Sequence, residues 1–403
     1  MVTDDELHSL RADLEARLAA YLDDLRRLTS IDCGTYTVGG VNEVGAWFAG
    51  QLRELGAEVE IVPGRRFGDT VVGRWAGAAD GPAGLLVGHL DTVFPEGTVA
   101  ERPFRTDEAR AYAPGVSDMK CGLISGIYAL RALRSLRGAD SAALLPFGRL
   151  AYVGNPDEEV ASPESTPIIA REAAQSDVAL VLESARATGE IVSARKGVAD
   201  IRLNLRGRAA HAGVEPEKGR SAIVEAAHKT VALAALNGRW PGVTVNVGVA
   251  SGGTRPNVVA EEAQLQIDLR APDQAAMDAA EAEIARICAQ TTVPDVTCEV
   301  VLGDRFAPMP RTAGITALAE RAVALAGRLG FELGHVATGG GSDANGIAGL
   351  GVPVLDGLGP IGGNDHAPGE YLELDSIVPR TTLLAALLLD VARSRAGSAA
   401  QRG

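Results

Sequence analysis

The sequence has few cysteines and no long apolar run, and each shortage excludes a class of protein. No cysteine pair has Cys-x-x-Cys or short disulfide spacing, so a reducing compartment fits the four at Cys33, Cys121, Cys288 and Cys298. No apolar run approaches the roughly 20 residues that cross a bilayer. The acidic N-terminus also lacks the basic start and apolar stretch of a signal peptide. We therefore expect a cytoplasmic protein without a membrane span.

Basic residues are in the minority. The chain has 52 acidic and 38 basic side chains, which gives a net charge of -14. This balance argues against a nucleic-acid partner or an anionic membrane surface, although an anionic substrate would respond to local charge. With 403 residues, 46% of them hydrophobic, the chain can form two or three domains with a large core.

The apolar pattern changes near residue 192. Residues 1–191 and 304–403 alternate buried strands with helices, which predicts an α/β domain with a parallel or mixed sheet covered on both faces. Residues 192–303 instead show apolar residues at every second position around two helical stretches. That pattern predicts a small α+β sandwich inserted into the larger domain.

Histidines and acids repeatedly follow the predicted buried strands of the α/β segments. The stretch "LLVGHLDTVFPEG" ends a strand in this way, and a buried polar group without partners would cost roughly 2–7 kcal/mol. Open α/β sheets bind ligands at the carboxyl ends of their strands. One such residue alone would be an ordinary cap or loop residue. The set comprises His89, Asp91, Asp118, Glu158, Glu159, Glu183 and His366.

Several such strand endings together favour a metal centre. Carboxylates gathered at one sheet edge would repel one another without a cation, and mixed His, Asp and Glu ligands suit zinc and its neighbours. Two imidazoles and three carboxylates can hold two metals if one carboxylate bridges them. In the adjacent pair Glu158 and Glu159, one can ligate while the other serves as a general base. His89 is then a ligand, and Asp91 can accept its second ring N–H.

The motifs "GHLDTV", "GVSDMK", "NPDEEV", "VLES", "GRAAHAG", "GGGSDAN" and "HAPGEYL" carry a family resemblance. In this order, from about residue 40 to 390, the chain resembles the dinuclear zinc aminoacylase/carboxypeptidase family, including acetylornithine deacetylase, succinyl-diaminopimelate desuccinylase and bacterial glutamate carboxypeptidases. The resemblance implies a mixed-sheet zinc-exopeptidase domain. It also implies an inserted α+β lid through which two chains form a homodimer.

The resemblance also implies individual roles at a site with two Zn2+ per chain, for which Co2+ or Mn2+ can substitute. Asp118 would bridge both ions, His89 and Glu183 would complete one site, and Glu159 and His366 the other. Glu158 would be the base, and Asp91 would support His89. Cys121 replaces the glycine common after "DMK", where a buried small residue is favoured over a metal ligand.

Other residues would bind the substrate. The resemblance implies that His211 in the lid donates to the oxyanion in the partner chain's site and that Asn257 contacts the substrate carboxylate or oxyanion. It implies that Arg270 binds a substrate carboxylate and that Arg305 adds a preference for an acidic side chain. Backbone N–H groups in the glycine run, which contains Gly339, Gly340 and Gly341, could bind an anion, with loose turn glycines as the alternative.

These observations predict an enzyme that hydrolyses an amide bond of a small peptide or N-acyl amino acid. The glutamate carboxypeptidase branch is the closest in resemblance, so release of a C-terminal residue such as glutamate is the first expectation. An N-acyl-amino-acid deacylase similar to acetylornithine deacetylase is the alternative. Two further hypotheses are a non-catalytic binding homologue and a two-metal phosphoesterase. The sequence contains no dedicated phosphate-binding motif that would support a phosphoesterase.

Overall fold

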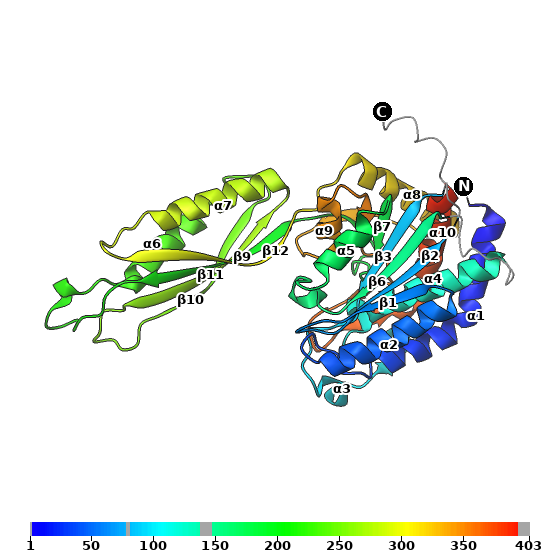
Figure 1. Cartoon of the computed structure of the whole chain (residues 1–403), viewed down its shortest axis with the longest axis horizontal. Helices are drawn as coiled ribbons and strands as arrows, with labels where there is room; N and C mark the ends of the chain where they lie inside the picture. Colours follow the sequence, from blue (N-terminus) through cyan, green and yellow to red (C-terminus); the bar gives the residue numbers. More distant parts are fainter. Residues whose placement is uncertain (1, 78–80, 138–146, 394–403) are drawn as a thin grey trace. The chain divides into compact units, whose positions relative to one another are not determined.

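The computed structural model describes residues 2–77, 81–137 and 147–393, and the chain divides into two compact units (Figure 1). Unit 1 comprises Met1–Ser193, Arg311–Ala337 and Ser342–Gly403; unit 2 comprises Ala194–Pro310 and Thr338–Gly341. The boundary expected at 303 falls inside strand β12 (Thr297–Phe306). The short return segment was not foreseen, because a run of glycines carries no strand or helix pattern.

Unit 1 contains a mixed sheet, which confirms the α/β prediction. The antiparallel pairs β1–β2 and β2–β6 adjoin the parallel strands β6, β3, β7 and β14. Among the described residues the order is β1 (Glu58–Val62), β2 (Thr70–Ala76), β6 (Arg149–Asn155), β3 (Ala83–His89), β7 (Val178–Val181) and β14 (Val354–Leu355). The parallel strands are almost wholly buried, as expected for strands covered on both faces.

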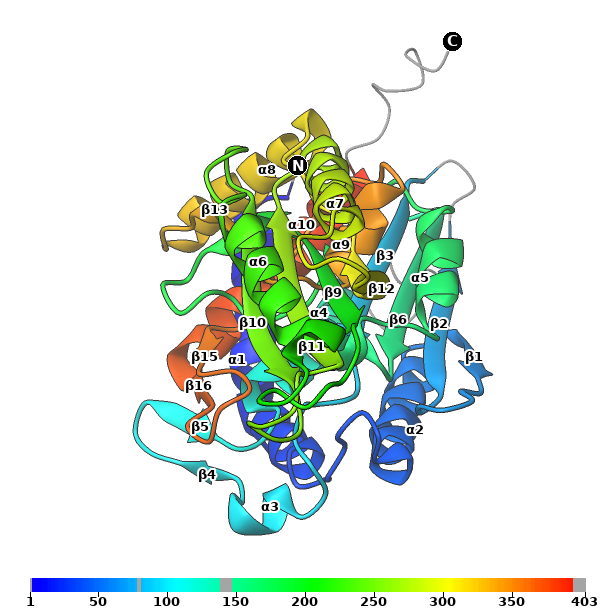
Figure 2. The ribbon, with the colours of Figure 1, turned by 90° about the vertical axis from the view of Figure 1, so that its left-hand side faces the viewer.

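Helices cover both faces of this sheet. The β3–β6 crossover contains α4 (Cys121–Arg137), and the β6–β7 crossover runs back past β3 and contains α5 (Thr166–Ala173). Because such crossovers are right-handed, the reversal of direction puts α4 and α5 on opposite faces (Figures 1 and 2). The other helices are α1 (Asp4–Leu28), α2 (Val38–Glu54), α3 (Thr98–Glu101), α8 (Ala313–Leu329), α9 (Asp343–Gly349) and α10 (Ile377–Arg393). This reversal creates a switch point beside β3, where open α/β sheets bind ligands.

Two further small sheets were missed by the sequence analysis. The first is antiparallel and contains β15 (Gly362–Gly363), β16 (Tyr371–Glu373), β5 (Arg110–Tyr112) and β4 (Arg105–Thr106). The second pairs β8 (Ile191–Arg195) with β13 (His335–Thr338). Most of these strands have only two to four residues, which is too short for apolar alternation to reveal them.

Unit 2 is an antiparallel sheet with two helices packed on one face, as the α+β prediction requires. The strand order is β10 (Thr244–Gly252), β11 (Glu262–Ala271), β9 (Gly197–Arg206) and β12. Alternate residues of β9 and β11 point into one core, which also contains apolar residues of α6 (Ala222–Ala234) and α7 (Gln274–Ala289). Across the described parts of both units, no helix is long and apolar enough to cross a membrane.

Candidate metal centre

Three parallel strands deliver the candidate side chains to one edge of the unit 1 sheet. His89 is the last residue of β3, and it is paired in register with Asn155, the last residue of β6. The turn Glu158–Val160 follows β6, and Glu183 follows β7. Since parallel strands end at the same edge, these residues converge although they are far apart in sequence.

Asp118 lies between the two candidate histidines. It belongs to the segment Val116–Lys120, which follows Gly115 (φ 71°) and leads into α4, and Asp118 itself has non-helical backbone angles (φ -111°, ψ 97°). Its Oδ1 is 2.9 Å from His89 Nε2, and its Oδ2 is 3.0 Å from His366 Nε2. One carboxylate therefore contacts both imidazoles, each through a different oxygen.

The remaining acids divide between the two histidines. Glu183 Oε1 is 3.7 Å from His89 Nε2, and Glu159 Oε2 is 3.1 Å from His366 Nε2. Two ligands on one tetrahedral zinc lie about 3.3 Å apart when each bond is about 2.0–2.1 Å. The observed separations bracket this value. Glu159 Oε1 is also buried without a hydrogen-bond partner in the described residues. The residues present thus fit a divalent cation, and His89, Asp118 and Glu159 offer ligand atoms that all lie within 4.8 Å of one another.

Asp91 holds the far side of the His89 ring. His89 Nδ1 lies 3.0 Å from the Asp91 backbone carbonyl oxygen and 3.3 Å from Oδ1 of the same residue. Asp91 Oδ2 accepts a hydrogen bond of 2.7 Å from the Thr35 hydroxyl. With Nδ1 engaged in this way, Nε2 points toward Asp118 and Glu183. The sequence predicted this contact with Asp91, but the backbone carbonyl is the nearer acceptor.

The charges of the site favour bound cations or protons. Burial lowers the pKa of His89, but Glu183 and Asp118 outweigh it and raise that pKa well above its usual range. Hydrogen bonds to Asp118 and Glu159 raise the pKa of His366 to about 10. Divalent cations can replace such protons, since metal binding requires neutral imidazoles and ionised carboxylates.

Glu158 begins the turn after β6, and although the residue as a whole is partly exposed, protein atoms surround its carboxyl group. Burial raises the pKa of its carboxyl well above its usual range; His89 opposes this shift, and Glu183 and Asp343 reinforce it. The turn that carries Glu158 ends in two non-glycine residues with left-handed backbone, Ala161 (φ 67°) and Ser162 (φ 54°). Such a conformation persists only where surrounding contacts hold it.

The sequence analysis did not identify two buried acids, Asp343 near this turn and Glu370 near the Asp118 loop. Asp343 accepts hydrogen bonds from Asn155 and from the Ser162 hydroxyl (2.6 Å), and burial raises its pKa to about 7. Glu370 accepts three backbone N–H groups of the Asp118 loop, and burial raises its pKa to about 7 despite these donors. Both lie in the quoted motifs "GGGSDAN" and "HAPGEYL", which are the sequence signal that could have identified them.

Cys121 is buried and does not join the candidate ligands. Its Sγ donates a hydrogen bond of 3.2 Å to the Ser117 backbone carbonyl oxygen. Burial raises the pKa of its thiol well above the usual range, which disfavours the thiolate that metals bind. These contacts fit the interpretation as a buried small residue.

His211 and Asn257 lie on adjacent segments of unit 2. His211 forms a β-bridge with Val258, and the Ala212 N–H donates to the Asn257 carbonyl oxygen at 3.0 Å. Both His211 and Asn257 are exposed. Unit 2 therefore presents these two predicted substrate-binding residues together on its surface.

Arg270 lies on β11 and is held in place by neighbours within unit 2. Its Nε and Nη2 donate to the Asp268 carboxylate at 2.7–3.0 Å, and Nη1 donates to the Gly339 carbonyl oxygen at 2.6 Å. These bonds engage three N–H groups and leave two of the five guanidinium donors without a partner in the described residues. The side chain remains 31% exposed.

The glycine run and Arg305 have hydrogen-bond and ion-pair partners within unit 2. The Gly340 and Gly341 carbonyl oxygens accept hydrogen bonds from Arg195 Nη1 at 2.9 and 3.2 Å, so this segment directs carbonyls toward arginines. Arg305 forms ion pairs with two acids of α7, Glu281 at 3.0 Å and Asp278 at 3.6 Å. These ion pairs connect β12 to α7.

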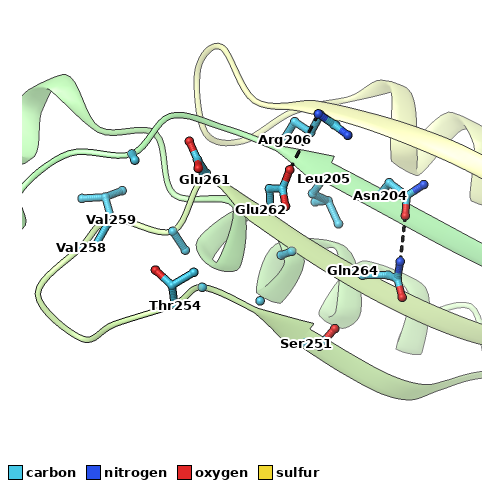
Figure 3. A pocket seen from close by; sticks show the side chains of 15 residues that line it. Asn204, Leu205, Arg206, Ser251, Thr254, Val258, Val259, Glu261, Glu262 and Gln264 are labelled. Atoms are coloured by element: carbon cyan, nitrogen blue, oxygen red, sulfur yellow. Dashed lines mark hydrogen bonds and ion pairs between the residues drawn. The ribbon is translucent and has the colours of Figure 1, made fainter.

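A separate cavity of about 450 Å³ lies in unit 2 and contains none of the candidate ligands (Figure 3). Its polar side chains pair with one another: Arg206 lies 3.8 Å from Glu262, and Gln264 donates to Asn204 at 3.1 Å. No histidine is among the residues that line this cavity, so it lacks the grouped His and carboxylate donors of the centre in unit 1.

Known proteins resemble this chain over much of its length. The family model described as peptidase family M20/M25/M40 matches residues 85–390. Carboxypeptidase G2 of Pseudomonas sp. (strain RS-16) is 30% identical over 377 residues, which cover 92% of this chain and 89% of that protein. N-acetyl-L-citrulline deacetylase of Xanthomonas campestris is 27% identical over 263 residues, covering 63% and 67% of the two chains.

A solved structure shows the same fold. Aminopeptidase PepT from Bacillus cereus superposes with a TM-score of 0.76 at 24% identity, covering 93% of this chain and 99% of that one. With the matched family model, the similarity to carboxypeptidase G2 and the grouped His89, Asp118 and Glu159, the chain belongs to peptidase family M20/M25/M40 and is a zinc-dependent hydrolase of amide bonds.

Proposed function

We propose that this enzyme is a carboxypeptidase-type exopeptidase that releases a C-terminal amino acid, such as glutamate, from a peptidyl or N-acyl substrate. The observation that carries the proposal is the placement of Asp118 between the two histidines, each with a further carboxylate beside it. The similarity to carboxypeptidase G2 supports the carboxypeptidase activity. The similarity to N-acetyl-L-citrulline deacetylase favours the second candidate, an N-acyl-amino-acid deacylase.

The metal ligands belong to the proposal. His89 and Glu183 would hold one Zn2+, His366 and Glu159 the other, and Asp118 would contribute one oxygen to each. When bound, the ions would polarise the scissile carbonyl and promote ionisation of a water molecule. Asp91 keeps the His89 ring oriented through Nδ1, so that Nε2 stays available.

Glu158 is the proposed general base. It sits in the same turn as Glu159, and its carboxyl lies in a setting where burial and nearby carboxylates favour the protonated form. A carboxylate with a raised pKa accepts a proton from the attacking water and can then deliver it to the leaving nitrogen. Glu158 would thus perform both proton transfers of amide hydrolysis.

Unit 2 supplies the proposed substrate contacts. Exposed His211 and Asn257 are available to another copy of the chain, so we assign them to the oxyanion and carboxylate of a substrate bound by the partner in a homodimer. The two unpaired N–H donors of Arg270 would bind the substrate's α-carboxylate. The proposal does not use Arg305, whose guanidinium pairs with acids of α7.

A substrate panel tests the proposal and separates the two candidates. Zinc-loaded enzyme would be assayed on dipeptides, N-acetyl amino acids and benzoyl-glutamates, each with a free and an amidated C-terminus. A carboxypeptidase should cleave peptides and benzoyl-glutamates with a free carboxylate, whereas a deacylase should prefer the N-acetyl compounds. Absence of turnover across the panel by fully loaded enzyme would contradict the proposal.

A further inference from the structure

Glu370 is a buried acid, and within the part of the chain that the structure describes its carboxylate accepts hydrogen bonds from one loop, Gly115–Asp118. Oε2 accepts from the Gly115 backbone N–H at 2.9 Å, and Oε1 accepts from the Ser117 and Asp118 N–H groups at 2.8 and 3.0 Å. Its side chain is nearly inaccessible, with the residue 2% exposed. Since three backbone donors converge on one carboxylate, Glu370 fixes the backbone from which the Asp118 side chain projects.

The same residue is anchored to the turn that carries His366. The Glu370 N–H donates to the Ala367 carbonyl oxygen at 3.2 Å, and the Ala367 N–H donates to the Asn364 carbonyl oxygen at 3.1 Å. Asn364 and His366 have left-handed backbone, with φ of 57° and 62°, a conformation that needs such support in non-glycine residues. Glu370 therefore joins the His366 turn to the Asp118 loop.

We propose that Glu370 is a positioning residue for both metal sites at once. Asp118 contacts His89 through one oxygen and His366 through the other, which requires its backbone to be held at one orientation. A shift of this loop would move both oxygens together. Loss of the Glu370 carboxylate should therefore weaken both cation sites, whereas loss of Glu159 or Glu183 should mainly weaken one. This inference rests on the two-cation centre of the proposed function.

Glu370→Gln is the variant that tests this role. Glutamine keeps the size of the side chain but has only one acceptor oxygen. Its amide nitrogen would face at least one backbone N–H, from which it cannot accept a hydrogen bond. Glu373→Gln is the matched control, because Glu373 lies three residues away on β16 and pairs with Arg110 at 2.7 Å. Zinc binding would be measured by calorimetric titration of metal-free protein, together with the rise in melting temperature that zinc produces.

The expected result is that Glu370→Gln weakens zinc binding about 10–100-fold at both sites, as removal of a group that supports a ligand typically does. Glu373→Gln should bind zinc like the wild type. The zinc-induced rise in melting temperature should shrink only for Glu370→Gln, and because it compares loaded with metal-free protein, it cancels a uniform loss of stability.

Unchanged zinc affinity in Glu370→Gln, even with a lower melting temperature of the metal-free protein, would overturn the inference, and so would weakening of one site alone. If Glu370→Gln fails to fold, Glu370→Asp is the variant to test. Its shorter side chain should lose part of the contact with the three N–H donors, so zinc should bind more weakly at both sites. Wild-type zinc affinity in Glu370→Asp would refute the positioning role. Because zinc affinity is scored without turnover, an enzyme that binds two zinc ions but hydrolyses no panel substrate would contradict the proposed function and not this inference.

Discussion

In the proposed function, Arg270 would make the enzyme require a free α-carboxylate on its substrate. Its side chain is fixed by Asp268 and the Gly339 carbonyl, and two N–H donors are left for a ligand. A hydrogen bond to a charged group contributes about 1.5–3 kcal/mol. Since about 1.4 kcal/mol corresponds to a factor of ten, Arg270→Ala should lower kcat/KM for a free-carboxylate substrate about 10–100-fold.

The assay compares free and amidated forms of the same substrate in wild type and variant. Amidation removes the carboxylate and Arg270→Ala removes its partner, so the two changes delete one interaction and their effects should not add. Arg270→Ala should thus have little effect on the amidated substrate. Arg270→Lys should restore part of the lost rate, because one ammonium cannot reproduce two parallel N–H donors.

Arg239→Ala is the control, since Arg239 is another unit 2 arginine in an ion pair, with Glu283 at 2.6 Å. It should leave both substrates unaffected. Equal turnover of free and amidated substrates by wild-type enzyme would refute the carboxylate anchor. An equal loss on both substrates in Arg270→Ala would assign Arg270 to the structure of unit 2 instead.

Three further predictions concern the general base, the shared site and a structural ion-pair cluster. Glu158→Gln should keep both metals by elemental analysis yet lose about 10²–10⁴-fold in kcat, whereas Glu159→Gln should lose metal; near wild-type turnover of Glu158→Gln would exclude it as the base. Mixing inactive His211→Ala and Glu158→Ala chains should restore some activity through one intact shared site, and verified heterodimers without recovery would contradict the shared site. Glu172→Gln should lower the free energy of urea unfolding at neutral pH by about 3–5 kcal/mol, because it breaks a buried ion-pair cluster. Hydrogen bonds from three arginines overcome burial and lower the pKa of Glu172 from 4.5 to about 2, so its stabilisation is complete above about pH 4.5 and is lost as pH falls toward 2; a difference between wild type and variant that does not shrink over that range would refute the assignment.

The sequence predicted the main sheet and the inserted sandwich because their strands and helices are long enough to show a period. It also predicted that His89, the Glu158–Glu159 pair and Glu183 follow buried strands of the main sheet. Asp118 and His366 instead follow β5 and β15, two short strands of the small antiparallel sheet.

The sequence could not predict the small sheet of β4, β5, β15 and β16, whose strands have two or three residues. The sequence also could not predict the Arg270–Gly339 and Arg195–Gly340 contacts, because every residue has a backbone carbonyl oxygen and the residue type does not reveal its partner.

Three buried acids of unit 1 show how the surroundings of a carboxylate separate a role in stability from a role in chemistry. Glu172 is surrounded by the guanidinium groups of Arg74, Arg149 and Arg171, which compensate its charge permanently and lower its pKa. Glu370 and Asp343, beside the candidate centre, are held by backbone N–H, hydroxyl and amide donors, all of which are neutral.

Neutral donors satisfy the hydrogen bonds of a buried carboxylate without cancelling its charge. In the contacts of Asp118 and Glu159 with histidines, a metal ion can likewise replace the proton, because an imidazole can give up its proton and a guanidinium cannot. The negative charge at this sheet edge is therefore compensated by protons that a divalent cation can displace. This arrangement explains why the same fold can hold one acid cluster as a fixed structural element and keep the other available for metal.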